Sequence, residues 1–144
     1  MVELVGYDGK SAEGWRRGFV HQSQSAFAER FADDIVLEAT TLAKPVEGKQ
    51  NVATVLAAAS SIYESLEFTA ESRDASTTYL QWRATAFGGM QIGGITILQR
   101  HTSGKIVAAA IHHRPIGAVL RFSAEIRDRL ADVIPADHFV RESA

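Results

Sequence analysis

The chain has 144 residues, 22% of them charged, and its formal net charge at pH 7 is −2. This length suits one domain over residues 1–144 with a single core. The balanced charge argues against nucleic acid as a partner, because no strongly basic surface is available to neutralise phosphates. The chain has no cysteine, which excludes disulfides, a thiol nucleophile and Cys-ligated metal centres.

Three features of the sequence indicate a cytoplasmic protein. The first ten residues, MVELVGYDGK, are too polar for a secretory signal, and the chain has no run of 18 apolar residues that could span a membrane. The lack of cysteine fits a reducing compartment. We therefore expect no membrane partner.

The N-terminal third is predicted to be helical. Residues 1–10 carry a turn signal and are predicted to form a loose lead-in, after which Ser11 is the predicted N-cap of a helical region ending at Asp33 and Asp34. The polar segment 21–25 is predicted to bend this region, with Ser23 or Ser25 capping a second helix. Each half has two aromatic residues four positions apart that need a larger surface to bury them: Trp15 with Phe19, and Phe27 with Phe31.

A short strand and a short helix follow. The segment 35–40 is rich in β-branched residues and is predicted to be a strand. Residues 42–50 are predicted to be a loop, because they include Pro45 and Gly48. The alanine-rich segment 52–60 is predicted to be a helix capped by Asn51.

From residue 62 the hydrophobic pattern changes to a period of two. Leu66, Phe68 and Ala70 alternate with polar residues, and the polar segment 72–76 is predicted to turn the chain. The segment 78–87 repeats the alternation, and the glycines at 88 and 89 then reverse the chain. This strand is predicted to present two faces, one of them formed by Leu80, Trp82, Ala84 and Ala86.

The segment 92–114 is predicted to be a long hairpin with its turn at 102–105, where Ser103 and Gly104 supply the turn chemistry. Gly93 and Gly94 are predicted to form a bulge or kink. Pro115 then suits the first turn of an amphipathic helix over residues 115–132.

The order of these elements predicts an α+β architecture. Helix, strand, helix, a four-stranded meander and a final helix place the helices on one side of a mostly antiparallel sheet. We expect this sheet to curve around an apolar cavity. If Thr96 and Leu98 face inward, Ile95, Ile97 and Gln99 face outward.

Three segments resemble the nuclear transport factor 2-like (NTF2-like) superfamily, which includes SnoaL-like polyketide cyclases and ketosteroid isomerases. These segments are FADDIVLE (31–38), PVEGKQNV (45–52) and GGITILQRHTSGKIVAAAIHHRP (93–115), and the matching order of elements covers residues 11–114. The resemblance implies a cone-shaped half-barrel covered by N-terminal helices, with a pocket in the cone and a homodimer formed through the convex sheet face. The C-terminal helix departs from the short tail of the isomerases.

The same resemblance predicts that the steroid-isomerase catalytic residues are absent. That chemistry needs a carboxylate base and two hydrogen-bond donors, a tyrosine and a protonated aspartic acid. The resembling segments place alanine at the base position (Ala39), threonine at the acid donor (Thr96) and tryptophan at the tyrosine (Trp15). Glu38 adjoins the base position, but the period of two points it to the opposite face.

A small hydrophobic ligand in the cone is the predicted partner. For Trp82 and Tyr63 the alternative is a plain core role, and Arg83, Arg100 and Arg114 are expected to be solvated strand-edge residues rather than ligand contacts. The predicted ligand-binding residues are Trp15, Phe19, Tyr63, Trp82, Thr96, Leu98 and Ile111.

His113 is the candidate catalytic residue. It alternates with Ala109 and Ile111, so it is predicted to point into the cone and to transfer a proton there, while His112 points away. The alternative is a histidine that only forms structural hydrogen bonds. The histidine spacing favours no metal site, and no cofactor is expected. Two functions stay open: an isomerase or lyase (a cyclase or dehydratase) using His113, and a non-catalytic ligand-binding or dimeric interaction module.

Overall fold

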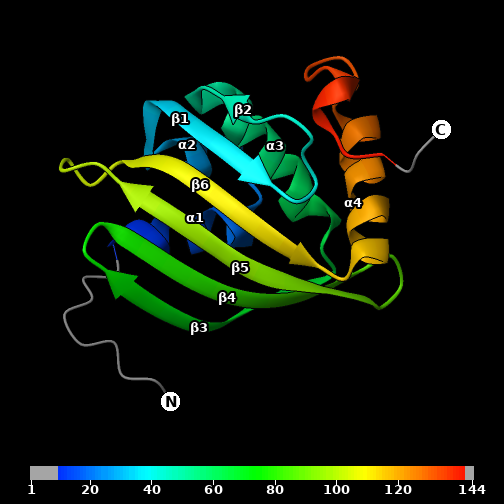
Figure 1. Ribbon diagram of the computed structural model, residues 1–144, viewed down its shortest axis with the longest axis horizontal. Helices are drawn as coiled ribbons and strands as arrows, with labels where there is room; N and C mark the ends of the chain where they lie inside the picture. Colours follow the sequence, from blue (N-terminus) through cyan, green and yellow to red (C-terminus); the bar gives the residue numbers. More distant parts are fainter. Residues whose placement is uncertain (1–9, 142–144) are drawn as a thin grey trace.

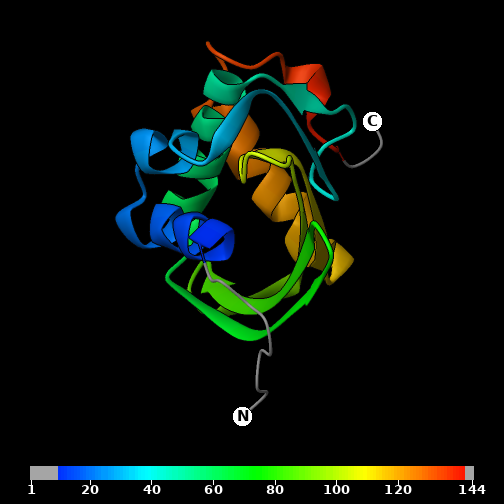
Figure 2. The ribbon, with the colours of Figure 1, turned by 90° about the vertical axis from the view of Figure 1, so that its left-hand side faces the viewer.

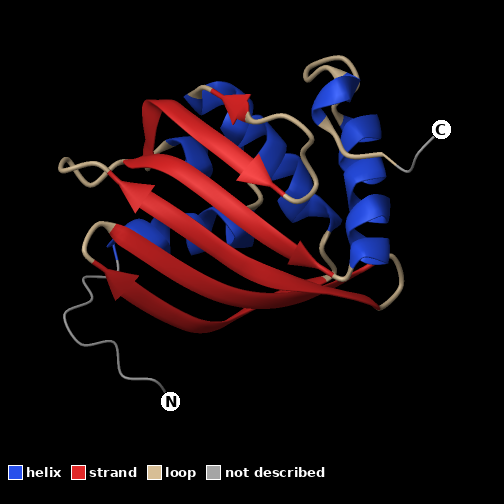
Figure 3. Cartoon of the chain, in the orientation of Figure 1, coloured by secondary structure: helices blue, strands red, loops and turns tan. Residues whose placement is uncertain are grey.

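A curved six-stranded sheet is the framework of the molecule, which we describe from a computed structural model over residues 10–141. Strand β1 runs parallel to β6, and every other neighbouring pair is antiparallel, so the predicted mostly antiparallel sheet is confirmed. Figures 1 and 3 show the strands side by side in the order β2-β1-β6-β5-β4-β3. The strands are β1 (Phe31–Ala39), β2 (Val46–Glu47), β3 (Ser65–Asp74), β4 (Thr77–Ala86), β5 (Met90–Arg100) and β6 (Ile106–Arg114).

Helices cover one face of this sheet, which confirms the α+β prediction. Helices α1, α2 and α3 lie behind the strands in Figure 1, and Figure 2 shows that the strands curve around the side on which these helices lie. We call this side the inner face and the opposite side the outer face. Helix α4 stands at the end of the sheet where β6 finishes. The helices are α1 (Lys10–His21), α2 (Gln24–Ala28), α3 (Lys49–Ile62), α4 (Ile116–Arg129) and a 3-10 helix (Ala136–His138).

The two faces of β4 differ as the alternation predicts. Leu80, Trp82, Ala84 and Ala86 are all buried, whereas Tyr79, Gln81 and Arg83, which alternate with them, are exposed. The pairing carries the inner face across the sheet, because Leu80 lies opposite Thr96, which lies opposite Ile111. On β5 the prediction also holds: Thr96 and Leu98 are buried, while Ile95 and Gln99 are exposed.

The central hairpin forms as predicted, but its irregularity lies elsewhere. Gly104 has a φ of 89° in the turn between β5 and β6. The predicted bulge at Gly93 and Gly94 is wrong: pairing is continuous through both, and the register shifts between Gln99 and Arg100. A side chain at Gly94 would instead meet β6, because its Cβ would lie 2.0 Å from the carbonyl oxygen of His112. Gly94 therefore permits a close approach of two strands.

The N-terminal helices end earlier than predicted. Helix α1 already includes Ser11, so this residue is not an N-cap, and the predicted lead-in falls almost wholly outside the described residues. Ser23 does cap α2, and its side chain accepts a hydrogen bond from the Ala26 amide. The predicted helix up to Asp34 is wrong because Phe31 pairs with Ile106, and this tertiary pairing overrides the helical spacing.

The segment before α3 also differs from the prediction. Part of the predicted loop 42–50 is the two-residue strand β2, which pairs with β1. Helix α3 begins after Gly48, whose φ is 94°, rather than after Asn51. The Asn51 side chain instead donates a hydrogen bond to the carbonyl oxygen of Glu47. A left-handed glycine therefore starts this helix without a side-chain cap.

Helix α4 begins at Ile116, one residue after the predicted start at Pro115, and ends at Arg129, before the predicted end at 132. The chain beyond it folds back over the loop that follows β1, where Phe139 is buried and bridges to Leu42. Ser123 is fully buried, and its Oγ lies 2.9 Å from the carbonyl oxygens of Thr41 and Val140. Of the helices in residues 10–141, none is long and apolar enough to cross a membrane.

Candidate functional site

The inner face carries a continuous cluster of aromatic rings. Helix α1 contributes Trp15 and Phe19, whose ring centroids are 5.6 Å apart, and Phe19 in turn lies 5.0 Å from Phe27. On the sheet side, Phe19 is 6.3 Å from Phe68 of β3. The rings contact one another at tilted or edge-to-face angles, which is the favourable geometry for aromatic pairs.

A small cavity lies inside this cluster. It offers about 10 Å³ to the centre of a water-sized sphere, room for roughly one water molecule. The predicted ligand residues converge on it except Leu98, which is fully buried beside it in the core. Sequence reasoning did not select Leu66 and Phe68, although the inner-face alternation of β3 had marked both. The cavity is lined by Trp15, Phe19, Tyr63, Leu66, Phe68, Trp82, Thr96 and Ile111.

The residues that line the cavity include hydrogen-bond donors among mostly apolar side chains. The indole nitrogens of Trp15 and Trp82 are buried, and neither has a hydrogen-bond partner among residues 10–141. Burial raises the pKa of Tyr63, so its phenol stays protonated at physiological pH. Buried donors of this kind normally have a partner. These donors distinguish the cavity lining from a purely hydrophobic core.

His113 is on the inner face but is not one of the residues that line the cavity. Its ring lies 5.5 Å from the Trp82 ring, edge-to-face, and 6.2 Å from Phe122 of α4. Burial lowers the pKa of His113 to about 4; the backbone of Ile111 opposes this shift, and the charge of His112 adds to it. The imidazole is therefore neutral at pH 7. Within the described chain its buried Nδ1 has no hydrogen-bond partner.

Sequence reasoning missed a buried carboxylate, Glu71. The alternation on β3 predicts that Ala70 faces inward, but the register shifts between Phe68 and Ala70, so Glu71 lies opposite the buried Leu80. Glu71 is only 7% exposed and forms an ion pair with Arg16 of α1. A bulge of this kind leaves no signature in a period-two pattern, so the sequence carried no signal for it.

A larger groove lies elsewhere and has a different character. Its volume is about 480 Å³, and it is lined by both polar and apolar residues at the edge of the sheet. Arg83 in this groove forms an ion pair with Glu67, and both side chains are more than half exposed. Arg114 is exposed as well. The lining of this groove includes three charged residues, Glu67, Arg83 and Arg114, so it does not suit the hydrophobic ligand predicted for the cone.

Comparisons with known proteins identify the fold. No protein-family model and no curated protein sequence matches the chain. Among solved structures, a steroid delta-isomerase from Pseudomonas aeruginosa superposes with a TM-score of 0.79 at 20% identity, over 91% of this chain and 96% of that one. An NTF2-like protein of unknown function from Mesorhizobium loti superposes with a TM-score of 0.66 at 20% identity, over 79% of this chain and 100% of that one. The chain has the NTF2-like fold.

The NTF2-like fold does not by itself assign an activity. A de novo designed protein with a curved β-sheet superposes on the chain with a TM-score of 0.71 at 12% identity, covering 86% of this chain and 99% of the design. A cone of this shape can thus be built without a natural function. The activity has to be argued from the residues inside the cone.

The residues in this NTF2-like cone do not provide the steroid-isomerase groups at the expected positions. Glu38 is exposed on the outer side, as the period of two predicts. Among the residues described, the cavity lining includes no carboxylate, and Thr96 occupies the predicted position of the acid donor. In residues 10–141 there is also no cluster of three His, Cys, Asp or Glu side chains suited to a metal ion.

Proposed function

We propose that this protein binds a small hydrophobic molecule in the NTF2-like cone, between α1 and the inner face of the sheet. One observation carries the proposal: the cavity is lined largely by aromatic side chains, and two of them, Trp15 and Trp82, have buried indole N–H groups without a partner in the described chain. Ligand sites in proteins are typically apolar hollows with a few such polar groups. An acceptor on the ligand would satisfy one or both indoles.

Binding of such a molecule would require α1 to move. The cavity has room for roughly one water molecule. Trp15 and Phe19 of α1 form one wall, and the other walls belong to the sheet and to Tyr63 after α3. Displacing α1 is the change that enlarges the cavity without breaking the sheet. We therefore assign the role of a lid to α1.

The two tryptophans allow a direct test. The chain contains two tryptophans, and both line the cavity, so their indole N–H signals in a ¹⁵N-correlated NMR spectrum report on it. Titration with 2-methoxynaphthalene is expected to shift both signals until they saturate. Phe19→Ala should change the affinity, while Val20→Ala should not, because Val20 is 76% exposed on the same helix. Indole signals that do not respond would contradict the proposal.

Proton transfer by His113 is the catalytic form of this proposal. Its support is the contact between the imidazole and Trp82, a wall of the cavity, and a neutral ring that can accept a proton. The test is hydrogen–deuterium exchange next to the carbonyl of 2-tetralone in D₂O, followed by NMR. The wild type should accelerate the exchange and His113→Gln should not. Binding of 2-tetralone without accelerated exchange would favour the non-catalytic module.

A homodimer through the outer face is also part of the proposal. Ile95 is 45% exposed and Tyr79 is 39% exposed, and both lie on the outer face of adjacent central strands. Ile97 lies opposite Tyr79 and extends this apolar patch. A second copy of the chain is a suitable partner because such a patch is self-complementary across a two-fold axis.

We also propose a cytosolic location for the protein. A chain without cysteine has no disulfide bonds that the reducing conditions of the cytosol could break.

A further inference from the structure

The bulge on β3 places a carboxylate on the inner face of the cone. Before the bulge, Phe68 lies opposite Trp82, and both line the cavity. After the bulge, Glu71 lies opposite Leu80, and Leu80 lies opposite Thr96, another lining residue. Glu71 thus belongs to the same cross-sheet row as Thr96, a wall of the cavity, and lies two strands further toward the sheet edge, with Leu80 between them.

Within residues 10–141, one oxygen of this carboxylate has a hydrogen-bond partner and the other has none. Oε1 of Glu71 accepts a hydrogen bond from the Nη1 of Arg16, which belongs to α1 next to the cavity residue Trp15. Oε2 is buried, and in the described part of the chain it has no hydrogen-bond partner. The Glu71 side chain is 6% exposed, against 34% for Arg16. A buried carboxylate oxygen without a donor is costly, so such an oxygen marks a place where a donor binds.

The ion pair restricts the chemistry of that donor. Arg16 already balances the charge of Glu71, so an added ammonium would bring an uncompensated positive charge into a site of low exposure. A neutral hydroxyl has no such cost and forms a strong hydrogen bond to a carboxylate. The cavity lining, which does not itself include Glu71, is aromatic and aliphatic apart from Thr96 and the Tyr63 phenol.

We infer that the ligand of the cone is a neutral aromatic molecule with a hydroxyl group, and that Oε2 of Glu71 accepts the hydrogen bond of this hydroxyl. This inference rests on the proposed function and names the ligand class for the same cavity. Glu71 is then a specificity-determining residue, because it distinguishes a hydroxyl from an ether of the same shape. When α1 moves to admit the ligand, Arg16 moves with it, so the hydroxyl binds where the lid meets the sheet.

The test compares 2-naphthol with 2-methoxynaphthalene by isothermal titration calorimetry at pH 7. The two probes share the ring system and an acceptor oxygen, but only 2-naphthol can donate. The ether is the more apolar compound and would bind better by partitioning alone. For the wild type we expect 2-naphthol to bind at least about tenfold more tightly, as for a hydrogen bond to a charged group.

Glu71→Gln is the decisive variant. Its amide oxygen would accept from Arg16 and leave an NH₂ group at the position of Oε2, so the preference for 2-naphthol should disappear. Glu67→Gln is the matched control, because Glu67 is on the same strand, 61% exposed and paired with Arg83. This control should keep the wild-type preference. Circular dichroism would confirm that both variants are folded.

The outcomes separate this inference from the proposed function. If neither probe binds the wild type, the proposed function fails and the inference fails with it. If both probes bind the wild type with equal affinity, or if Glu71→Gln keeps the preference, the cone binds hydrophobic molecules but Glu71 does not select a hydroxyl. If Glu71→Gln does not fold, the ratio of the wild-type affinities for 2-naphthol and 2-methoxynaphthalene still tests the inference.

Discussion

Gly94 is a residue whose lack of a side chain shapes the site. It lies opposite both Trp82 on β4 and His113 on β6. The rings of these two residues meet at 5.5 Å, and glycine leaves the strand between them without a side chain. An added Cβ would lie 2.0 Å from the carbonyl oxygen of His112 and 3.2 Å from the Cα of His113. These neighbours are backbone atoms, which cannot move aside as the end of a flexible side chain can.

Gly94→Ala is therefore expected to destabilise the protein by about 3 kcal/mol or more, the upper range for overpacking. Gly117→Ala is the control, because a Cβ at Gly117 would meet no heavy atom within 4 Å and alanine favours the helix. This control should leave stability unchanged or raise it by up to about 1 kcal/mol. Urea denaturation measures both, and equal midpoints for the two variants would refute the argument.

His113 should make stability depend on pH. The folded state holds its pKa at about 4, against 6.5 in an unfolded chain, so between these values the unfolded state binds a proton that the folded state does not. The contribution of His113 to the free energy of unfolding is therefore largest above pH 6.5. It decreases as the pH drops toward 4 and stays constant below that. The expected loss is up to about 3 kcal/mol.

The measurement compares wild type and His113→Gln by urea denaturation at several pH values from 7 to about 3.5. The difference between their free energies of unfolding should change within the window from 6.5 to 4 and nowhere else. His101→Gln is the control, since His101 is exposed beside the β5–β6 turn and should reproduce the wild-type curve. A pH-independent difference for His113→Gln would show that the imidazole titrates normally.

At the scale of the elements, the sequence predicted the strands whose alternation is unbroken. On β4 the pattern assigned Leu80, Trp82, Ala84 and Ala86 to the inner face correctly. On β3 a bulge shifts the register after Phe68, and the same rule therefore missed Glu71. Bulges depend on the pairing partner, which a single strand's sequence does not encode.

Helix boundaries failed for a related reason. Phe27 and Phe31 have helical spacing, but Phe31 is the first residue of β1 because it pairs with Ile106, 75 positions later in the chain. Their rings still contact each other, 6.4 Å apart, across the end of α2. Long-range pairing thus decided the boundary, and the local pattern predicted only that the two rings would meet.

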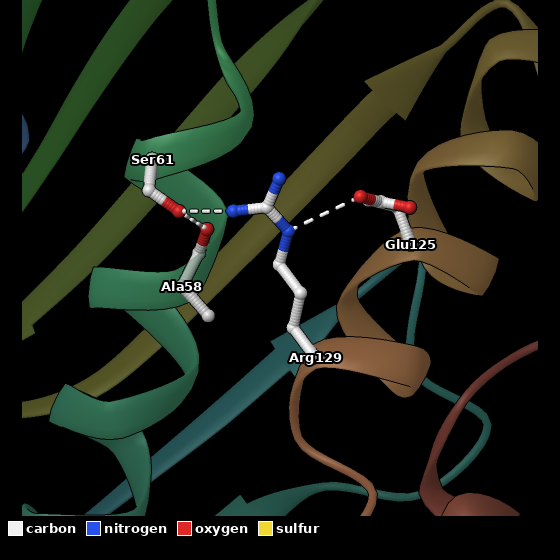
Figure 4. Close-up of polar contacts among 4 residues, drawn as sticks. All are labelled: Ala58, Ser61, Glu125 and Arg129. Atoms are coloured by element: carbon white, nitrogen blue, oxygen red, sulfur yellow. Dashed lines mark hydrogen bonds and ion pairs between the residues drawn. The ribbon is translucent and has the colours of Figure 1, made fainter.

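The aromatic residue Phe122 anchors α4 to the core more strongly than the polar contacts of the helix do. Phe122 is 1% exposed and stacks on Tyr63 at 4.9 Å. On the other flank of the helix, Arg129 donates a hydrogen bond to Ser61 of α3 at 2.8 Å and pairs with Glu125 at 3.2 Å (Figure 4). Burial of a ring contributes far more than exposed ion pairs.

Phe122→Ala is accordingly expected to cost about 3 to 5 kcal/mol. Arg129→Ala should cost about 1 kcal/mol or less, because its side chain is 43% exposed and water replaces the lost contacts. Thermal or urea denaturation checks both values. A larger loss for Arg129→Ala than for Phe122→Ala would mean that the polar contacts, not the ring, fix α4.

For the whole molecule, the shape was more predictable than the size of the cavity. The order of elements predicted a curved sheet with helices on one face, and the sheet and helices follow it. The volume of the cavity depends on how each aromatic ring is oriented. Rings such as Phe19 and Phe68 fill most of the cone, and no periodicity in the sequence carries that information.

The oligomeric state tests the outer face. Ile95→Arg would put a charge within the apolar patch formed with Tyr79 and Ile97, so a homodimer should dissociate at least about tenfold more readily. Gln91→Arg on the same strand is the control, because Gln91 is exposed near the strand end, away from this patch. Sedimentation equilibrium gives the dissociation constants. A monomeric wild type would refute the dimer, and an unchanged constant for Ile95→Arg would place the interface elsewhere.

The parallel pairing of β1 with β6 has a consequence for how the chain reaches this state. Leu37 lies beside Ala109, and only the two-residue strand β2 flanks β1 on its other edge. During synthesis β1 therefore emerges long before its main neighbour exists. Closing such a long loop is slow because its entropy must be lost before the contact forms. The ribosome will thus have made the chain as far as β6 before β1 can pair with its main neighbour.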